Sequence, residues 1–205
     1  MDLKSFNILM VGIGGQGVIR AIQILTWAAL LDDYKVRTAE THGMAQRGGS
    51  VSSFLRFGYE VEGPLIPSGN SQIIIALEAS EAARYFRYAN SDTIFLINDK
   101  IIVPPTVQLL NMEYPDLNSI GSFLKQISTN VFFIKGHEEA LKAGDLRSLN
   151  VYMIGVLVGS NQLPIKQKTL ENSIRRFIPR KAQEINKIAF NIGIEKGKLI
   201  KGDIK

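Results

Sequence analysis

The stretch that decides the fold is residues 7–17, NILMVGIGGQG, which joins an apolar run to a turn containing four glycines. Residues 7–11 indicate a buried strand. Residues 18–31 carry apolar side chains at helical spacing, and residues 35–39 predict a second short strand. A strand, a tight turn, a helix and a strand in this order are typical of the opening of a parallel α/β sheet.

The rest of the chain continues this alternation and then becomes helical. We expect buried strands at 73–77, 93–98 and 131–135, helices at 78–87 and 121–128, and further helices at 138–143, 150–160, 166–177 and 179–191. Residues 50–57 have β character, and residues 60–62 return after a turn. The sequence therefore predicts a Rossmann-like α/β fold. Its sheet is doubly wound and mostly parallel, with a hairpin insertion around Ser50–Glu62 and a helical C-terminal segment.

We expect one domain over residues 1–193, helical from about residue 150, with residues 194–205 as a frayed tail. Apolar residues make up 45% of the 205 residues, enough for a sizeable core. No apolar run approaches the roughly 18–20 residues that a membrane span requires. We therefore expect no membrane span, and the lack of cysteine, which rules out disulfides, suits a cytoplasmic protein.

The chain contains no cysteine. This excludes disulfides, thiolate nucleophiles and cysteine-ligated zinc or iron–sulfur clusters on this chain. Its two histidines, His42 and His137, are too few for most histidine-rich metal sites. We therefore predict no metal site.

The formal net charge of +5 concentrates after Pro164, where 11 Lys and Arg stand against four Asp and Glu. Such a basic segment suits nucleic acid. However, the charges recur at helical spacing and no aromatic residues are interleaved for stacking. The solvated faces of amphipathic helices explain them better, so we do not expect a nucleic-acid partner.

The glycine turn matches the pattern G-x-G-x-x-G through Gly12, Gly14 and Gly17, with Gly15 and Gln16 between the last two. Glycines at the start of a helix let the backbone approach an anion, so a dinucleotide or phosphate site is one reading. Glu40, after the second strand, would then meet a ribose hydroxyl. The other reading, slightly favoured, is that the glycines only allow the strand and the helix to pack closely.

A second glycine-rich segment, residues 40–50, is ETHGMAQRGGS. It brings the polar side chains of Glu40, His42, Gln46 and Arg47 together after a strand, at the edge of the sheet where ligands bind in such folds. Arg47 is suited to bidentate binding of a carboxylate, and His42 to proton exchange near neutral pH. Such a polar, glycine-broken segment can also form an interface, with Arg47 paired to another subunit.

Taken together, the two motifs resemble the gamma-type domain of the 2-oxoacid:ferredoxin oxidoreductases. The Thr-His-Gly-Met-Ala-Gln run beginning at Thr41 resembles the beta subunit of the indolepyruvate branch. The resemblance spans residues 5–193. It also rests on the Pro-Leu-Ile-Pro run at 64–67, the strand end at 76–78, the proline pair at 104–105 and residues 150–155.

The resemblance implies an oxidoreductase that oxidatively decarboxylates arylpyruvates such as indolepyruvate, forming an aryl-acetyl-CoA from coenzyme A and passing electrons to ferredoxin. The chain has no cysteine, nor a Gly-Asp-Gly motif with a downstream Asn-Asn. Thiamine diphosphate, Mg²⁺ and [4Fe-4S] clusters are therefore expected on a larger alpha-type partner subunit, which also meets ferredoxin. This chain would be inactive alone.

Within that resemblance, Arg47 and His42 are the predicted site-completing catalytic residues. Gln46, Glu40 and the glycine turn (Gly12, Gly14, Gly15, Gln16 and Gly17) would form a ligand-binding or interface surface. Two other functions stay open: a subunit for another 2-oxoacid, such as pyruvate or ketoisovalerate, and a stand-alone dinucleotide-binding protein that uses the glycine turn. A nucleic-acid-binding module is the weakest alternative.

Overall fold

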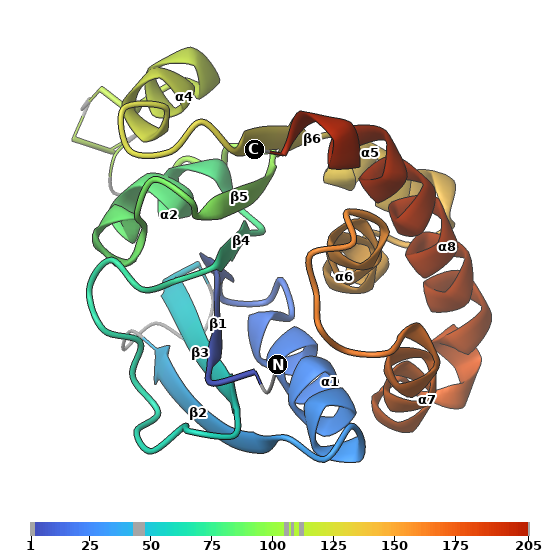
Figure 1. The fold of residues 1–205 in the computed structure, drawn as a ribbon. Helices are drawn as coiled ribbons and strands as arrows, with labels where there is room; N and C mark the ends of the chain where they lie inside the picture. Colours follow the sequence, from blue (N-terminus) through green and yellow to red (C-terminus); the bar gives the residue numbers. More distant parts are fainter. Residues whose placement is uncertain (1–2, 43–47, 105–106, 108, 111–112, 205) are drawn as a thin grey trace.

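The computed structural model describes residues 3–42, 48–104, 107, 109–110 and 113–204. Strands and helices alternate along the first two thirds of the chain, except that β2, β3 and β4 follow one another directly, and helices come after (Figure 1). The strands are β1 (Phe6–Ile13), β2 (Lys35–His42), β3 (Ser50–Gly58), β4 (Ile73–Ala76), β5 (Ile94–Asn98) and β6 (Val131–Ile134). The helices are α1 (Val18–Leu31), α2 (Ala79–Arg84), α4 (Leu117–Leu124), α5 (Gly136–Lys142), α6 (Leu149–Gly159), α7 (Gln167–Phe177) and α8 (Gln183–Ile200). Single 3₁₀ turns are η1 (Phe86–Tyr88), η2 (Leu146–Ser148), η3 (Arg180–Ala182) and η4 (Lys201–Asp203).

The strands form one sheet in the order β2-β3-β1-β4-β5-β6. The pairings β1–β4, β4–β5 and β5–β6 are parallel, which confirms the predicted mostly parallel α/β sheet. Only β3 runs the other way, and it pairs antiparallel with both β1 and β2. Because β3 reverses direction on both sides, β2 runs in the same direction as β1 and ends at the same edge of the sheet.

The predicted hairpin insertion is present, but the strand predicted to pair with residues 50–57 was wrong. β3 forms the hairpin with β2, from Lys35 opposite Gly58 to His42 opposite Val51. Residues 60–62 form no strand. The segment is instead tied to the sheet by Arg37 and Arg56, whose side chains donate to the carbonyl oxygens of Glu62 and Gly63.

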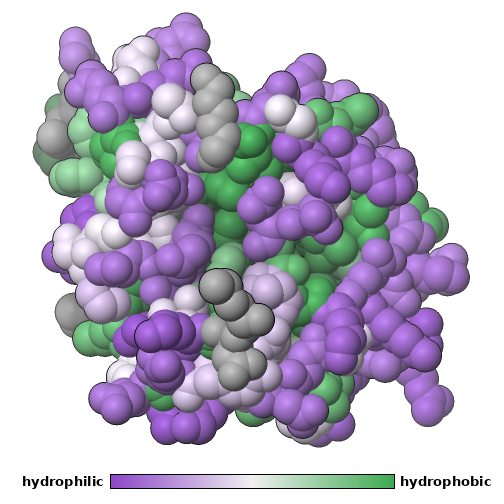
Figure 2. All heavy atoms as spheres, viewed as in Figure 1, coloured by the Kyte–Doolittle hydropathy of each residue, from purple (hydrophilic) through white to green (hydrophobic). Residues whose placement is uncertain are grey.

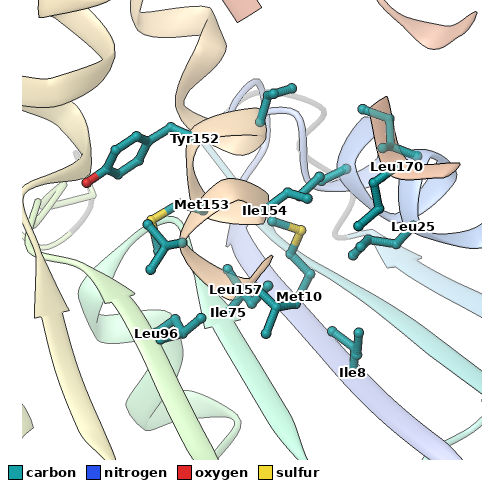
Figure 3. Close-up of a cluster of buried hydrophobic side chains, with 14 of the residues drawn as sticks. Ile8, Met10, Leu25, Ile75, Leu96, Tyr152, Met153, Ile154, Leu157 and Leu170 are labelled. Atoms are coloured by element: carbon teal, nitrogen blue, oxygen red, sulfur yellow. The ribbon is translucent and has the colours of Figure 1, made fainter. Parts of the chain in front are cut away.

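Both faces of the sheet are buried, as expected for parallel strands covered by helices. Alternate residues of the central strands, such as Ile8, Met10 and Ile75, join α1 and α6 in one hydrophobic core (Figure 3). The intervening residues, such as Leu9 and Ile74, join α2 and α4 in the other. The sheet therefore has helices on both sides, with the larger helical layer formed by α1 and the C-terminal helices (Figure 1).

The last helix, α8, does not end where the sequence suggested. Helix α6 is buried nearly all round, and α8 packs along it and continues to Ile200. The expected frayed tail is therefore wrong for this stretch: Ile194, Gly197 and Ile200 are buried, and η4 follows directly. The reason is the close crossing of α6 and α8, where glycines face each other's backbones.

In Figure 2, hydrophobic side chains gather in the seam between the sheet and the C-terminal helices, and hydrophilic ones cover most of the surrounding surface. Among the described residues, no helix is long and apolar enough to cross a membrane.

Candidate functional site

The glycine turn lies where β1 meets α1, at the carboxyl edge of the sheet. Gly17 has a φ of 82° and forms the N-cap of α1 in the left-handed conformation, and Gly15 has a φ of 104°. Side chains rarely adopt such backbone conformations. Gly12 is the last-but-one residue of β1, and a Cβ there would lie 2.7 Å from Gln16 Oε1 and 3.1 Å from Leu77 Cβ. Close packing therefore explains Gly12, and conformation explains Gly15 and Gly17.

The side chain of Gln16 is held inside the fold. Its Oε1 accepts from the Ile13 N–H at 2.7 Å, and its Nε2 donates to the Leu77 carbonyl at 3.0 Å. Leu77 directly follows β4, the strand beside β1, and α1 and α2 leave these two strands toward opposite faces of the sheet. This is the switch point at which open α/β sheets bind ligands. The Gln16 side chain spans this switch point through its hydrogen bonds to Ile13 and Leu77.

A second amide continues this bridge. The Leu77 carbonyl also accepts from Asn98 Nδ2 at 2.9 Å, and Asn98 Oδ1 accepts from the His137 N–H at 3.0 Å. Asn98 is fully buried at the end of β5. The hydrogen bonds thus run from the end of β1 across β4 and β5 to α5.

Asn150, at the start of α6, supports the turn from the helical side. Its Nδ2 donates to the Gly17 carbonyl at 3.0 Å, and only 4% of the residue is exposed. A buried amide that makes such bonds holds two segments in one register, because leaving its polar atoms unpaired would be costly. Asn150 therefore fixes the glycine turn against the C-terminal helices.

The two glycine-rich segments meet in the structure, a contact that the sequence did not predict. The Gly14 N–H donates to the Gly49 carbonyl at 2.8 Å, and the Gly48 N–H donates to the Gly14 carbonyl at 3.4 Å. His42 is the last residue of β2, opposite Val51 of β3. Gln46 and Arg47 lie outside the described residues, so their predicted roles stay predictions.

Glu40 is not brought to the glycine turn. It is exposed on β2, opposite Ser53 of β3, and β3 separates β2 from β1. At about 4.8 Å between neighbouring strands, β2 lies about 10 Å from β1 across the sheet. In the dinucleotide fingerprint the acidic residue serves the same ligand as the turn, so the inserted β3 disfavours that reading.

Two buried carboxylates, which sequence reasoning did not select, lie beside the turn. Glu78 is fully buried and caps α2: its Oε2 accepts from Ser80 Oγ at 2.6 Å and from the Glu81 N–H at 3.1 Å. Its Oε1 accepts from the Ile102 N–H at 3.0 Å. Glu78 therefore anchors the segment after β5. The only signal in the sequence was an acid directly after a buried strand.

Glu81, 4% exposed, ties α2 to the second glycine-rich segment. Its carboxylate accepts from Ser50 Oγ, and from Arg84 Nε at 3.0 Å. Tyr114 shares a hydrogen bond with Ser80 in the same network, and burial raises the pKa of its phenol. These contacts fix the end of the segment that begins at Glu40.

We call this region of the sheet edge the carboxyl rim: residues 14–17, 48–50 and 78–81, with Asn98 and Asn150. Gln16, Glu78, Glu81, Asn98 and Asn150 all bind other parts of the chain. Gly15 and Gly48 are open instead, because a Cβ on either would meet nothing within 4 Å. Among the described residues, no three His, Asp or Glu side chains gather as metal ligands. The rim thus offers bare backbone rather than free acids and bases.

A family model described as pyruvate ferredoxin/flavodoxin oxidoreductase matches residues 7–196. A protein from Archaeoglobus fulgidus named indolepyruvate oxidoreductase subunit IorB is 39% identical over 91% of this chain and 92% of its own length. The protein of that name from Pyrococcus horikoshii is 36% identical over 96% of this chain and 98% of its own. A 2-oxoglutarate synthase subunit KorC from Methanothermobacter marburgensis is 26% identical, with coverage of 92% and 95%.

Solved structures share the fold. The gamma subunit of a keto/oxoacid ferredoxin oxidoreductase from Geobacter sulfurreducens has a TM-score of 0.67 and 20% identity, with 95% of this chain and 99% of that chain covered. A 2-oxoglutarate:ferredoxin oxidoreductase from Magnetococcus marinus has a TM-score of 0.69 and 18% identity, with 98% of this chain but 32% of that chain covered. With the family model matching almost the whole length, the chain belongs to the pyruvate ferredoxin/flavodoxin oxidoreductase family.

Proposed function

We propose that this chain is the small subunit of an indolepyruvate:ferredoxin oxidoreductase and is inactive alone. The complex would decarboxylate an arylpyruvate, join the remaining aryl-acetyl group to coenzyme A, and pass the released electron pair to ferredoxin. The relatives at 36–39% identity carry the indolepyruvate name, whereas the 2-oxoglutarate relative is more distant at 26%. That difference favours indolepyruvate over another 2-oxoacid.

The observation that carries the proposal is the carboxyl rim. Its polar side chains are engaged within the chain, and its exposed part at Gly15 and Gly48 is backbone without side chains. A surface of this kind suits close approach by another subunit or by a ligand that the subunit holds. In the Magnetococcus marinus relative, the matching region is 32% of a longer chain, which supports a role beside further catalytic regions.

We place thiamine diphosphate, Mg²⁺ and [4Fe-4S] clusters on a larger alpha-type subunit that also meets ferredoxin. The donor set supports this: the chain has no cysteine to ligate a cluster, and the buried carboxylates Glu78 and Glu81 are already hydrogen-bonded. Coenzyme A would be a co-substrate near the rim. We also place the complex in the cytoplasm, in line with a chain that cannot form disulfides.

Arg47 is proposed as the contact to an anionic group of the substrate or of coenzyme A, with His42 and Gln46 beside it. An arginine suits this role because its planar group binds carboxylate or phosphate through two hydrogen bonds. Losing this contact should lower the activity of the assembled complex and leave the stability of this chain unchanged.

The test is to co-express the chain with the larger subunit of the same organism, purify the complex without oxygen, and measure dye reduction with indolepyruvate and coenzyme A. We expect activity from the complex, none from either subunit alone, and less with pyruvate or 2-oxoglutarate. Arg47→Ala should lower the activity of the assembled complex, while Arg180→Ala, at an exposed position in η3, should not. A chain that does not assemble with that subunit, or a complex inactive on every 2-oxoacid, would refute the proposal.

A further inference from the structure

A hollow of about 240 Å³ lies between α1, β2 and the end of α7. It is lined by Ile22, Gln23, Thr26, Trp27, Thr38, Glu40 and Phe177. Trp27 and Phe177 meet edge to face, with ring centroids 6.5 Å apart. The hollow thus combines aromatic walls with polar atoms from a helix and from a strand.

Two polar groups of the hollow have no partner among the described residues. Thr26 Oγ1 is buried and makes no hydrogen bond to that part of the chain. Within the described part of the chain, Glu40 enters no ion pair. A carboxylate, a hydroxyl and the nearby amide of Gln23 form a set rich in acceptors, which matches the three donors of an ammonium group. The Arg176 guanidinium already lies 4.2 Å from the Trp27 ring centroid, so Glu40, and not this ring, is the feature that would attract a further cation.

The hollow borders an open edge of the sheet. In the described structure β2 is the end strand and pairs only with β3, over all eight of its residues. The opposite edge strand, β6, has four residues. A long edge strand offers unpaired N–H and C=O groups to another chain. Arg37 covers the Val36 carbonyl with its own side chain, so the free part of the edge is the half that carries Thr38 and Glu40.

We propose that an extended segment of the larger subunit pairs with the edge of β2 and places a lysine side chain in the hollow. Directly opposed side chains of neighbouring strands lie on the same face with Cβ atoms about 4.5–5.5 Å apart, so a lysine opposite Thr38 or Glu40 reaches the carboxylate. Main-chain bonds would supply the pairing, and the hollow would select the basic residue. The inference rests on the proposed function only in naming the larger subunit as the occupant.

The decisive experiment treats the purified complex of the two subunits with a carbodiimide, which joins a carboxylate to an amine that it touches. We expect mass spectrometry to find Glu40 joined to a lysine of the larger subunit, and this cross-link to vanish in Glu40→Gln. Hydrogen exchange should show the amides of residues 38–41 slowed in the complex relative to the free chain. Glu40→Lys should weaken assembly at least tenfold, while Glu195→Lys, the same charge change on α8, should not.

The outcomes separate this inference from the proposed function. An active complex in which Glu40 forms no cross-link and β2 exchanges as in the free chain would overturn the docking inference and leave the function standing. If instead the chain does not assemble with the larger subunit, the proposed function fails, and the inference fails with it.

Discussion

The contact between Gly17 and Asn150 can be tested by a double-mutant cycle. In Gly17→Ala, the new Cβ would lie 2.6 Å from Asn150 Nδ2, and the residue would keep a φ of 82°. The left-handed conformation costs a non-glycine residue about 1–2 kcal/mol. Asn150 could move away only by giving up its bond to the Gly17 carbonyl, worth about 0.5–1.5 kcal/mol. We therefore expect Gly17→Ala to lower the free energy of unfolding by about 2–3 kcal/mol.

Thermal unfolding of the purified chain measures this effect. For a chain of this size, about 1 kcal/mol corresponds to about 2–4 °C, so Gly17→Ala should lower the Tm by about 5–10 °C. Asn150→Ala alone should cost about 1–3 kcal/mol, because it removes a buried hydrogen bond.

The double variant distinguishes strain from collision. With Asn150 truncated, the alanine methyl at position 17 has room, and only the backbone strain remains. The double variant should thus be about 1 kcal/mol more stable than the sum of the single effects predicts. Strict additivity would show that Asn150 does not press on the turn, and would refute this account of how α6 holds it.

Three further predictions concern the core. Gly159→Ala would place a Cβ well under 3.0 Å from the Ile194 backbone of α8. The variant should therefore lose about 2–3 kcal/mol of unfolding free energy, because the two helices are forced apart. Gly202→Ala, whose Cβ would meet nothing within 4 Å, is the control, and equal Tm values for the two variants would contradict the close crossing. Tyr152→Phe removes a buried hydroxyl that has no hydrogen-bond partner among the described residues, so it should leave the Tm unchanged or raised. A large loss of Tm would contradict this. Burial raises the pKa of the Tyr152 phenol above the usual 10.0, so the unfolded state loses this proton first; the wild type should therefore lose more stability than Tyr152→Phe as the pH rises above 10.0, as urea titrations at several pH values would show.

The sequence predicted the elements well where the signal was local. Residues 18–31 form α1 with the expected bounds, because apolar spacing and the preceding glycines act within one segment. The strands at β4, β5 and β6 lie within one residue of the expected ranges. Apolar runs bounded by polar residues leave little choice in a sheet that is covered on both faces.

Pairing and the chain end were harder, because both depend on residues far apart in the sequence. The partner of β3 is β2 and not residues 60–62, and nothing in the local alternation of residues 50–62 distinguishes these two hairpins. The predicted frayed tail is a helix because glycines of α6 and α8 meet, a contact between positions about 40 residues apart.

For the site, the sequence by itself determined the glycine turn, its place before α1 and the absence of any thiolate. Only the tertiary structure decided that Gln16 bridges to Leu77, that β3 keeps Glu40 away from the turn, and that Glu78, Glu81, Asn98 and Asn150 hold the rim in place. The physical reason is that backbone conformation and apolar spacing are properties of neighbouring residues. The partners of a buried polar group are supplied by segments that only folding brings together.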